Sequence, residues 1–356
     1  MGSEEKISFI TDSDFEKLLD NLAEKKNVYI PQAVTNCKGG TYFHYELRSS
    51  GEKFTYYGYR PSNTLKSFLF AGQDKVAEYP SSDREDQISP KEPVAIVGAA
   101  SCDIESVKSL DVIFLQEEFT DIFYREKRNN TFIITGDCTE PRETCFCTLA
   151  GLTPYPKEGF DLNLSRVEGG FIIEAGSEKG EEVMTQNSSL FSEAGEDRLR
   201  ARDEKRSETT RKIEELNKDY ALSRNRRELL EIQRETDQWY EHVKTCVACG
   251  ACLLACPTCH CFLLYDQEGT EGKFERIKKW DTCVYAGYSR MAGGGSPRLG
   301  LMERFRHRYL HKFEYYPKNF GFEACVGCGR CIEGCMGKID MRKVFKALDT
   351  LTVGAK

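Results

Sequence analysis

The chain has 356 residues, of which 40% are hydrophobic and 30% are charged, and its formal net charge is -7 at pH 7. This length is sufficient for two domains that each bury a core. The negative net charge argues against binding to nucleic acid or to an anionic membrane surface. The sequence contains no apolar run that approaches a membrane span, and its first residues show no basic region followed by an apolar stretch, so no signal peptide is expected. We therefore expect a globular cytoplasmic protein without membrane insertion.

The first 185 residues predict a domain of mixed α/β structure. Apolar runs at 93–97 and 131–135 each precede a glycine, and a helix-like stretch at 103–110 lies between them. Strand, helix and strand in this order indicate a parallel β-α-β unit. Three further elements are expected in this domain: an amphipathic helix that opens at Ser13, a strand at 41–47 and a hairpin near 161–174.

Residues 186–243 differ in composition from the segments on either side. They are dense in Arg, Lys and Glu, contain no proline and hold few apolar residues. Their sparse apolar stripe predicts one or two surface helices. We interpret this segment as a charged helical linker between two domains, and a docking surface for a partner subunit is the alternative.

Two cysteine cassettes lie within residues 244–340, and each has the spacing C-x2-C-x2-C-x3-C. In this pattern three thiolates of one tight loop bind a [4Fe–4S] cluster, and the fourth commonly binds the cluster of the other cassette. Zinc also binds paired C-x2-C motifs, but zinc sites rarely have a third and a fourth cysteine at this spacing. We predict two [4Fe–4S] clusters, bound by Cys246, Cys249, Cys252, Cys256, Cys325, Cys328, Cys331 and Cys335.

The connection between the two cassettes is much longer than that of a small bacterial ferredoxin. We therefore expect it to hold helices, one of them near 301–312, as in ferredoxin domains of the α-helical type. The fold class predicted for the whole chain is α+β. Its parts are a mixed α/β domain (1–185), a charged helical linker (186–243), an α-helical ferredoxin-type domain with both cassettes (244–340) and a tail with a short amphipathic helix (341–356).

Four further cysteines predict a third site in the first domain. Cys102 and Cys138 each follow a predicted buried strand and its glycine. Because the carboxyl ends of parallel strands meet at one edge of a sheet, where α/β proteins bind ligands, we expect these two thiols to lie close together. Cys145 and Cys147 follow in the next loop. We predict a third iron–sulfur cluster held by some or all of these four cysteines, with ordinary buried thiols as the alternative.

Other residues near the cassettes have several possible roles. Cys259, Cys261 and Cys283 are candidates for additional ligands, for a further site, or for thiols that tune a cluster from outside its ligand set. The basic stretch 298–312 is interpreted either as a solvated face or as a source of positive potential for the clusters or for an acidic partner. Cys37 has no cysteine nearby and is expected to be structural. No dinucleotide-binding or P-loop motif is present, so a flavin or nicotinamide is expected on another chain.

These motifs resemble those of the iron–sulfur β-subunits of cytosolic NAD(P)-linked [NiFe] hydrogenases, the sulfhydrogenases. They are equally similar to those of the iron–sulfur subunit of the anaerobic sulfite reductase. The resemblance covers about residues 61–340 and rests on T-C-F-C at 144–147, C-P-T-C-x-C at 256–261 and C-V-G-C-G-R-C at 325–331. It implies that the cysteines of both cassettes and of the predicted third site are cluster ligands. Met336 replaces the proline that the family has there, which implies a looser loop and a shifted cluster potential.

The resemblance also implies a function and partners. We expect an electron-transfer subunit without catalytic residues of its own, in a complex with a flavoprotein that reacts with NAD(P)H and with a catalytic subunit. That subunit is a hydrogenase, a sulfite reductase or an enzyme of the heterodisulfide-reductase type. The alternative is a catalytic redox subunit that acts on a disulfide or sulfur substrate at an unusual cluster. A third interpretation is a structural or regulatory metal-binding module.

Overall fold

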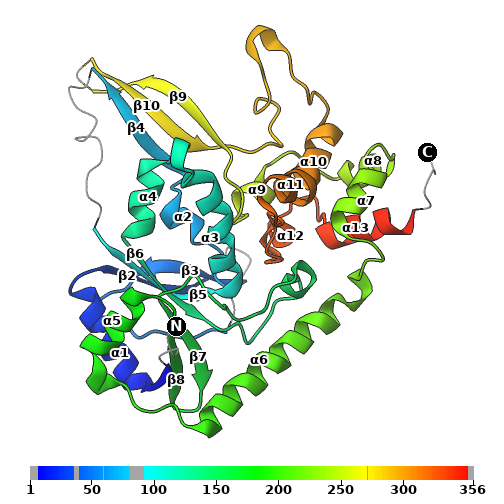
Figure 1. The fold of residues 1–356 in the computed structure, drawn as a ribbon. Helices are drawn as coiled ribbons and strands as arrows, with labels where there is room; N and C mark the ends of the chain where they lie inside the picture. The colour runs from blue at the N-terminus through cyan, green and yellow to red at the C-terminus, as the bar shows by residue number, and fades with distance from the viewer. Residues whose placement is uncertain (1–6, 36–39, 59, 81–91, 271, 352–356) are drawn as a thin grey trace.

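A computed structural model describes residues 7–35, 40–58, 60–80, 92–270 and 272–351. Cys37 lies outside these residues. A seven-stranded sheet of order β1-β8-β7-β6-β5-β2-β3 forms the centre of the N-terminal half (Figure 1). Neighbouring strands among β2, β5, β6 and β7 are parallel, whereas β1, β3 and β8 run antiparallel to their partners. The strands are β1 (Ile7–Thr11), β2 (Asn27–Thr35), β3 (Thr41–Leu47), β5 (Val94–Ala100), β6 (Thr131–Gly136), β7 (Leu162–Val167) and β8 (Gly170–Ala175).

Helices cover both faces of this sheet. Successive residues of a strand point to opposite sides, so a central strand contributes side chains to two cores. Ala95 and Val97 belong to the core beneath α1 (Asp12–Ala23) and α5 (Glu178–Gln186). Ile96, between them, belongs to the core on the other face. That face is covered by α2 (Lys66–Leu69), α3 (Ser101–Phe114) and α4 (Ile122–Asn129). The strands expected at 93–97 and 131–135, and the helix between them, are confirmed as a parallel β-α-β unit.

A second sheet joins distant parts of the chain. It has three antiparallel strands in the order β4-β10-β9. They are β4 (Gln73–Tyr79), β9 (Phe262–Glu268) and β10 (Phe274–Trp280). The hairpin of β9 and β10 lies in the connection between the cassettes, where only helices were predicted. It is stable there because β4, from the first half of the chain, pairs with β10, and because the Trp280 indole N–H donates to the Phe70 carbonyl oxygen at 3.0 Å.

The remaining helices form the C-terminal half of the molecule. A π-helical turn (His311–Tyr315) follows α10 directly and leads into α11, so the helix predicted at 301–312 is confirmed and continues further. These helices are α6 (Glu196–Asn217), α7 (Arg226–Ile232), α8 (Gln238–Val243), α9 (Ala251–Leu254), α10 (Leu301–Leu310), α11 (Tyr316–Phe320), α12 (Arg330–Glu333) and α13 (Met341–Thr350).

A second hydrophobic core lies among these helices. Leu229 of α7 and Trp239 of α8 pack with Tyr309 of α10 and Phe345 of α13. The charged segment 186–243 was expected to form surface helices, but α7 and α8 each bury apolar residues in this core. The amphipathic helix expected in the tail is confirmed, and its apolar face completes the same core.

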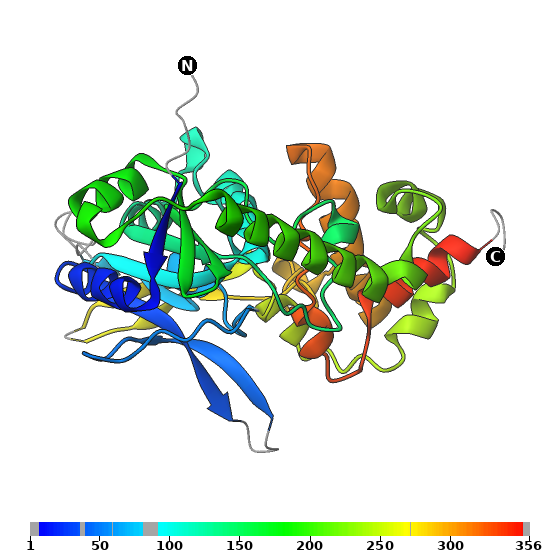
Figure 2. The ribbon, with the colours of Figure 1, turned by 90° about the horizontal axis from the view of Figure 1, so that it is seen from below.

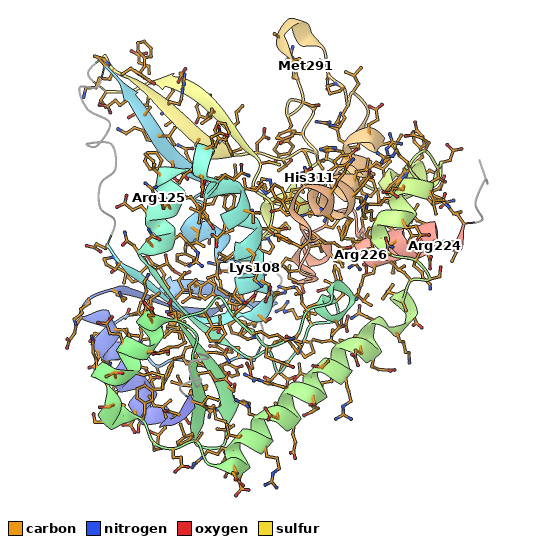
Figure 3. All side chains as sticks on the ribbon, in the orientation of Figure 1. Lys108, Arg125, Arg224, Arg226, Met291 and His311 are labelled. Atoms are coloured by element: carbon orange, nitrogen blue, oxygen red, sulfur yellow. The ribbon has the colours of Figure 1, made fainter. Side chains whose placement is uncertain are left out.

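Helix α6 connects the two halves along one side of the molecule, as two perpendicular views show (Figures 1 and 2). Most of this 22-residue helix is exposed, and Thr209, Ile213 and Asn217 are its buried residues. The connection between β10 and α10, which contains Met291, projects away from the rest of the molecule (Figure 3). Within the described residues, no helix is long and apolar enough to cross a membrane.

Candidate iron–sulfur centres

The two cassettes share one backbone conformation. The residue after the second cysteine is Gly250 in the first cassette and Gly329 in the second, with φ values of 73° and 74°. The residue before that cysteine, Ala248 or Gly327, also has a positive φ, of 54° or 62°. Left-handed residues in such loops turn successive N–H groups toward one point, which favours an anionic ligand. The equal spacing of the cysteines therefore reflects an equal local structure.

The repeat continues beyond the loops, because α9 and α12 begin directly after these glycines. The Leu253 amide donates to the Gly250 carbonyl at 2.9 Å, and the Ile332 amide donates to the Gly329 carbonyl at 2.9 Å. The amides of the fourth cysteines, Cys256 and Cys335, make matching bonds of 3.2 Å one turn later. The two short helices also contact each other. The cassettes thus form an internal structural repeat whose two units are adjacent.

Each fourth cysteine lies among the first three cysteines of the other cassette. Burial raises the pKa of Cys246, and the neighbouring thiols that raise this pKa further are Cys252, Cys335 and Cys249. Burial likewise raises the pKa of Cys331 to about 12, and the thiols that contribute are Cys328, Cys256 and Cys325. This grouping is compatible with the exchange of fourth ligands that the sequence pattern predicts for a pair of [4Fe–4S] clusters.

Buried donors beside both cassettes fit a bound anionic group. Arg308 is buried, and its Nε and Nη2 atoms have no hydrogen-bond partner among the described residues. Burial alone lowers the pKa of Arg308, but negative charge on Cys252 and Cys331 raises that pKa well above its usual range overall. The guanidinium therefore lies close to sulfur atoms of both cassettes. Cluster sulfides are suitable acceptors for such N–H groups, and a [4Fe–4S] cluster supplies one-electron redox chemistry when bound.

In the described part of the chain, no group of three or more His, Cys, Asp or Glu side chains is placed to hold a single metal ion. The thiols of each cassette lie instead along a loop and at the start of a short helix.

The four cysteines of the predicted third site line one small cavity of about 20 Å³. Strands β5 and β6 are parallel neighbours in which Ala100 pairs with Gly136, so Cys102 and Cys138 follow at the same edge of the sheet. Burial raises the pKa of Cys138 well above its usual range, and the charges of Cys145 and Cys147 raise it further. The structure thus brings together all four residues. The cavity also touches Gly327 and Cys328, so it borders the second cassette.

Close backbone packing joins this third site to the second cassette. The Phe146 amide donates to the Gly327 carbonyl at 2.7 Å, and a Cβ built on Gly327 would lie 2.5 Å from the carbonyl carbon of Phe146. A Cβ built on Gly329 would lie 2.2 Å from the carbonyl oxygen of Thr144. In the first cassette the position equivalent to Gly327 is Ala248, which carries a Cβ at nearly the same φ. Glycine is required in the second cassette because the 144–147 loop packs against it.

Two buried arginines, which the sequence did not single out, connect the second cassette to the N-terminal domain. Arg330 forms an ion pair with Asp103 at 2.8 Å, and these side chains are 2% and 0% exposed. The Arg60 Nε atom donates to the Cys328 carbonyl at 2.6 Å, and its guanidinium lies 2.9 Å from Glu333. One feature of the sequence could have indicated this pair: Asp103 and Arg330 are each next to a cysteine in the chain.

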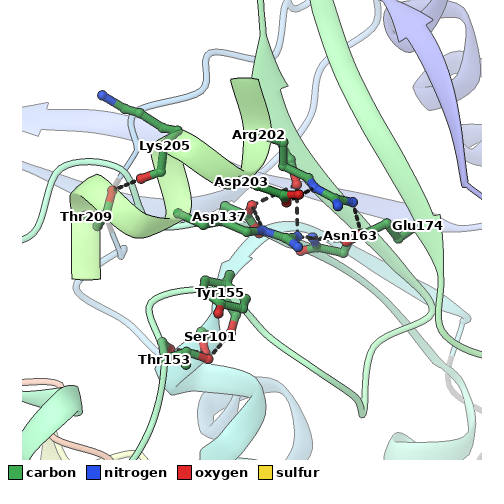
Figure 4. Close-up of polar contacts among 12 residues, drawn as sticks. Ser101, Asp137, Thr153, Tyr155, Asn163, Glu174, Arg202, Asp203, Lys205 and Thr209 are labelled. Carbon is green, nitrogen blue, oxygen red and sulfur yellow. Dashed lines mark hydrogen bonds and ion pairs between the residues drawn. The ribbon is translucent and has the colours of Figure 1, made fainter. Parts of the chain in front are cut away.

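Helix α6 is anchored beside the third site through Asp137, the residue before Cys138. Arg206 of α6 donates to the Asp137 carboxylate at 2.6 and 3.2 Å and to Glu174 at 2.8 Å. Asn163 also donates to Asp137, at 3.0 Å, and Figure 4 shows this group of polar contacts. Burial alone lowers the pKa of Arg206, but the hydrogen bond to Asp137 and its charge raise that pKa overall. The network holds the strand end that carries Cys138.

We expect Arg206→Leu to lower the free energy of unfolding by about 2–3 kcal/mol, because Asp137 and Glu174 then remain as partly buried like charges. The matched control on the same helix is Lys212→Leu. Lys212 pairs with Glu208 at the surface, where both side chains are more than 40% exposed, so we expect a loss below about 0.5 kcal/mol. Urea denaturation of the three proteins checks this prediction, and equal losses in both variants would contradict it.

The additional cysteines near the first cassette form two thiol pairs. The Cys259 thiol donates to Cys256, which therefore has a pKa well below its usual range, and the pKa of Cys259 is raised in turn. The Cys283 thiol donates to Cys261 and, with further donors such as Tyr288, lowers the pKa of Cys261 to about 6. The structure thus places Cys259 against a cassette cysteine, and places Cys261 and Cys283 against each other.

Comparisons with known proteins agree with this architecture. Residues 245–339 match the 4Fe-4S dicluster domain family. The chain is also 34% identical over 253 residues to the Sulfhydrogenase 2 subunit beta of Pyrococcus furiosus, a match that covers 70% of this chain and 72% of that protein. The chain therefore belongs to the family of sulfhydrogenase beta subunits and carries a 4Fe-4S dicluster domain in its C-terminal half.

Proposed function

We propose that this chain is the electron-transfer iron–sulfur subunit of a multi-subunit oxidoreductase. In this proposal it relays single electrons between a flavoprotein subunit that reacts with NAD(P)H and a catalytic subunit. The observation that carries the proposal is the crossed grouping of cassette cysteines beside a cavity lined by four more cysteines. The name of the relative, a sulfhydrogenase subunit, supports a place in a complex of the hydrogenase type.

The proposed clusters follow one another in space. The first is assigned to Cys246, Cys249, Cys252 and Cys335, the second to Cys325, Cys328, Cys331 and Cys256, and the third to Cys102, Cys138, Cys145 and Cys147. The third site borders Cys328, and α9 of the first cassette contacts α12 of the second. Cys328 is buried, whereas Cys249 is exposed. The second cluster thus lies between the other two, and the first cluster offers an exit at the surface.

Cys259, Cys261 and Cys283 are assigned as neighbours of the clusters rather than as ligands. Support comes from their packing, since Cys283 is buried with Leu253 and Val284, and Cys259 and Cys261 pack against the same apolar cluster. The charged segment 186–243 is assigned as the connection between the two halves, supported by the buried contacts of α6 with the third-site region.

The metal content of the anaerobically purified full chain tests the three-cluster assignment. We expect about twelve iron and twelve sulfide ions per chain, four of each for every cluster. Cys147→Ala should lower both to about eight, because one ligand set is lost. Cys283→Ala should leave both unchanged, because this residue is assigned outside the ligand sets. A wild-type content of about eight or less would exclude the third cluster, and a loss of iron in Cys283→Ala would make that residue a ligand.

Purification of the native complex tests the role itself. A flavoprotein and a catalytic oxidoreductase subunit should co-purify with this chain, and the isolated chain should show no turnover. A stable monomer that occurs alone in the cell would contradict the proposal. Reduction of a disulfide or sulfur substrate by the isolated chain would favour the alternative, a catalytic subunit.

A further inference from the structure

The two fourth cysteines of the repeat have different surroundings. The Cys256 sulfur lies 3.3 Å from the Lys312 ammonium and 3.2 Å from the Thr258 hydroxyl. Its counterpart Cys335 accepts a hydrogen bond from the backbone amide of Ile339 at 3.3 Å. At the position of Thr258 the other cassette has Gly337, which has no hydroxyl group. The two sulfur atoms occupy equivalent positions in the repeat, but only Cys256 has a charged donor beside it.

The structure holds Lys312 in this place through a local departure from α-helical geometry. Residues His311–Tyr315 form a π-helical turn, and His311 at its start is labelled in Figure 3. Turns of this kind are rare and occur frequently at functional sites. The Lys312 side chain is 3% exposed, and its ammonium also donates to the Thr258 hydroxyl at 2.9 Å and to the Ala324 carbonyl at 3.0 Å. Its three acceptors, Cys256 included, come from two separate segments of the chain, at 256–258 and at 324.

A buried ammonium is unfavourable unless a negative charge lies beside it. At this position the negative charge is that of a cluster ligand, and it increases by one unit when the cluster takes up an electron. A nearby cation stabilises the reduced state more than the oxidised state, because the Coulomb attraction grows with the added charge. Hydrogen bonds to ligand sulfur act in the same direction, and both are known determinants of cluster potential.

We propose that Lys312 is a positioning residue that raises the reduction potential of the second cluster, the one that Cys256 helps to bind. Thr258 assists by positioning the ammonium, because its hydroxyl accepts from Lys312 and donates to the Ala324 carbonyl. This inference rests on the proposed electron-transfer function and concerns how readily one cluster of the relay accepts an electron. The second cluster, which lies between the other two, accepts an electron more readily than it would with a neutral side chain at position 312.

The test is a redox titration of the full chain, purified anaerobically with its clusters and followed by electron paramagnetic resonance. Lys312→Met keeps the length of the side chain and removes its charge. We expect the equilibrium of one cluster to shift at least tenfold toward its oxidised state. For a one-electron couple this corresponds to a reduction potential that is about 59 mV lower. Lys312→Arg, which keeps the charge, should restore most of the wild-type potential.

The repeat supplies the matched control, Lys338→Met. Lys338 follows Cys335 by three residues, as Cys259 follows Cys256, and its side chain is exposed. Removal of this solvated charge should change the ratio of reduced to oxidised cluster by much less than tenfold, because water screens the charge. If Lys312→Met does not retain its clusters, Thr258→Val becomes the deciding variant, and we expect a smaller shift in the same direction.

Two results would overturn the inference. One is an unchanged potential in Lys312→Met or, where that variant loses its clusters, in Thr258→Val. The other is an equal shift in Lys338→Met. A wild-type chain without iron would instead overturn the proposed function, so the two failures are distinguishable.

Discussion

Asp103→Asn should lower the free energy of unfolding by about 3–5 kcal/mol, because it leaves the buried Arg330 guanidinium without its counter-charge. The two side chains are 0% and 2% exposed and lie 2.8 Å apart. Arg330 also donates to the Pro61 carbonyl at 2.7 Å, so the pair ties the second cassette to the N-terminal domain. The asparagine can still accept one hydrogen bond, but it carries no charge. Urea denaturation of chains with equal iron content measures the loss.

A surface pair provides the control for this effect. Asp266 and Arg276 lie 2.8 Å apart, but their side chains are 53% and 44% exposed. Asp266→Asn should therefore cost less than about 1 kcal/mol. The double variant Asp103→Asn, Arg330→Met should recover part of the stability that the single variant loses, since no buried charge then remains unpaired. Similar small losses in Asp103→Asn and Asp266→Asn would show that the buried pair does not hold the two halves together.

Gly329→Ala should destabilise the protein by about 2–5 kcal/mol, more than Gly250→Ala in the other cassette. Both glycines have a φ near +74°, so an alanine meets the same left-handed strain of about 1–2 kcal/mol at either position. The difference lies in what the new Cβ meets. At position 329 it lies 2.2 Å from the backbone oxygen of Thr144, whereas at 250 its nearest atom is the Tyr285 hydroxyl oxygen at 2.8 Å, on a side chain that can move.

The comparison of these two variants isolates the packing of the 144–147 loop against the second cassette. Gly250→Ala should lose only the strain, about 1–2 kcal/mol. Gly329→Ala should lose in addition an overpacking energy of about 1–3 kcal/mol and should lower the iron content, because the loop carries Cys145 and Cys147. Equal stability and equal iron content in the two variants would contradict the proposed contact between the third site and the second cassette.

Local features of this protein were predictable from the sequence. The spacing of the cassettes predicts their loops, because three cysteines and a left-handed glycine within seven residues determine a turn without help from the rest of the chain. The apolar runs at 93–97 and 131–135 predict buried strands for a similar reason. Once these strands are parallel neighbours, Cys102 and Cys138 follow at one edge of the sheet. The proximity of Cys102 and Cys138 was therefore predictable from local patterns and one rule of topology, whereas the place of Cys145 and Cys147 depends on the packing of their loop.

Other features depend on which surfaces meet, and the chain shows no local pattern for them. The hairpin of β9 and β10 is rich in charged residues and finds its third strand, β4, almost 200 residues away. The basic stretch 298–312 has two interpretations from its sequence, yet the structure buries Arg304, Arg308 and Lys312 from it.

The spacing of cysteines thus determined which residues gather around each site, since backbone torsions and hydrophobic periods act over a few residues. Only the tertiary structure decided which buried charges stand beside them. The π-helical turn sets the position of Lys312, and the packing of α3 against α12 pairs Asp103 with Arg330. A buried charge is stable only where a partner is brought to it, and that partner comes from a remote segment whose position the local sequence does not encode.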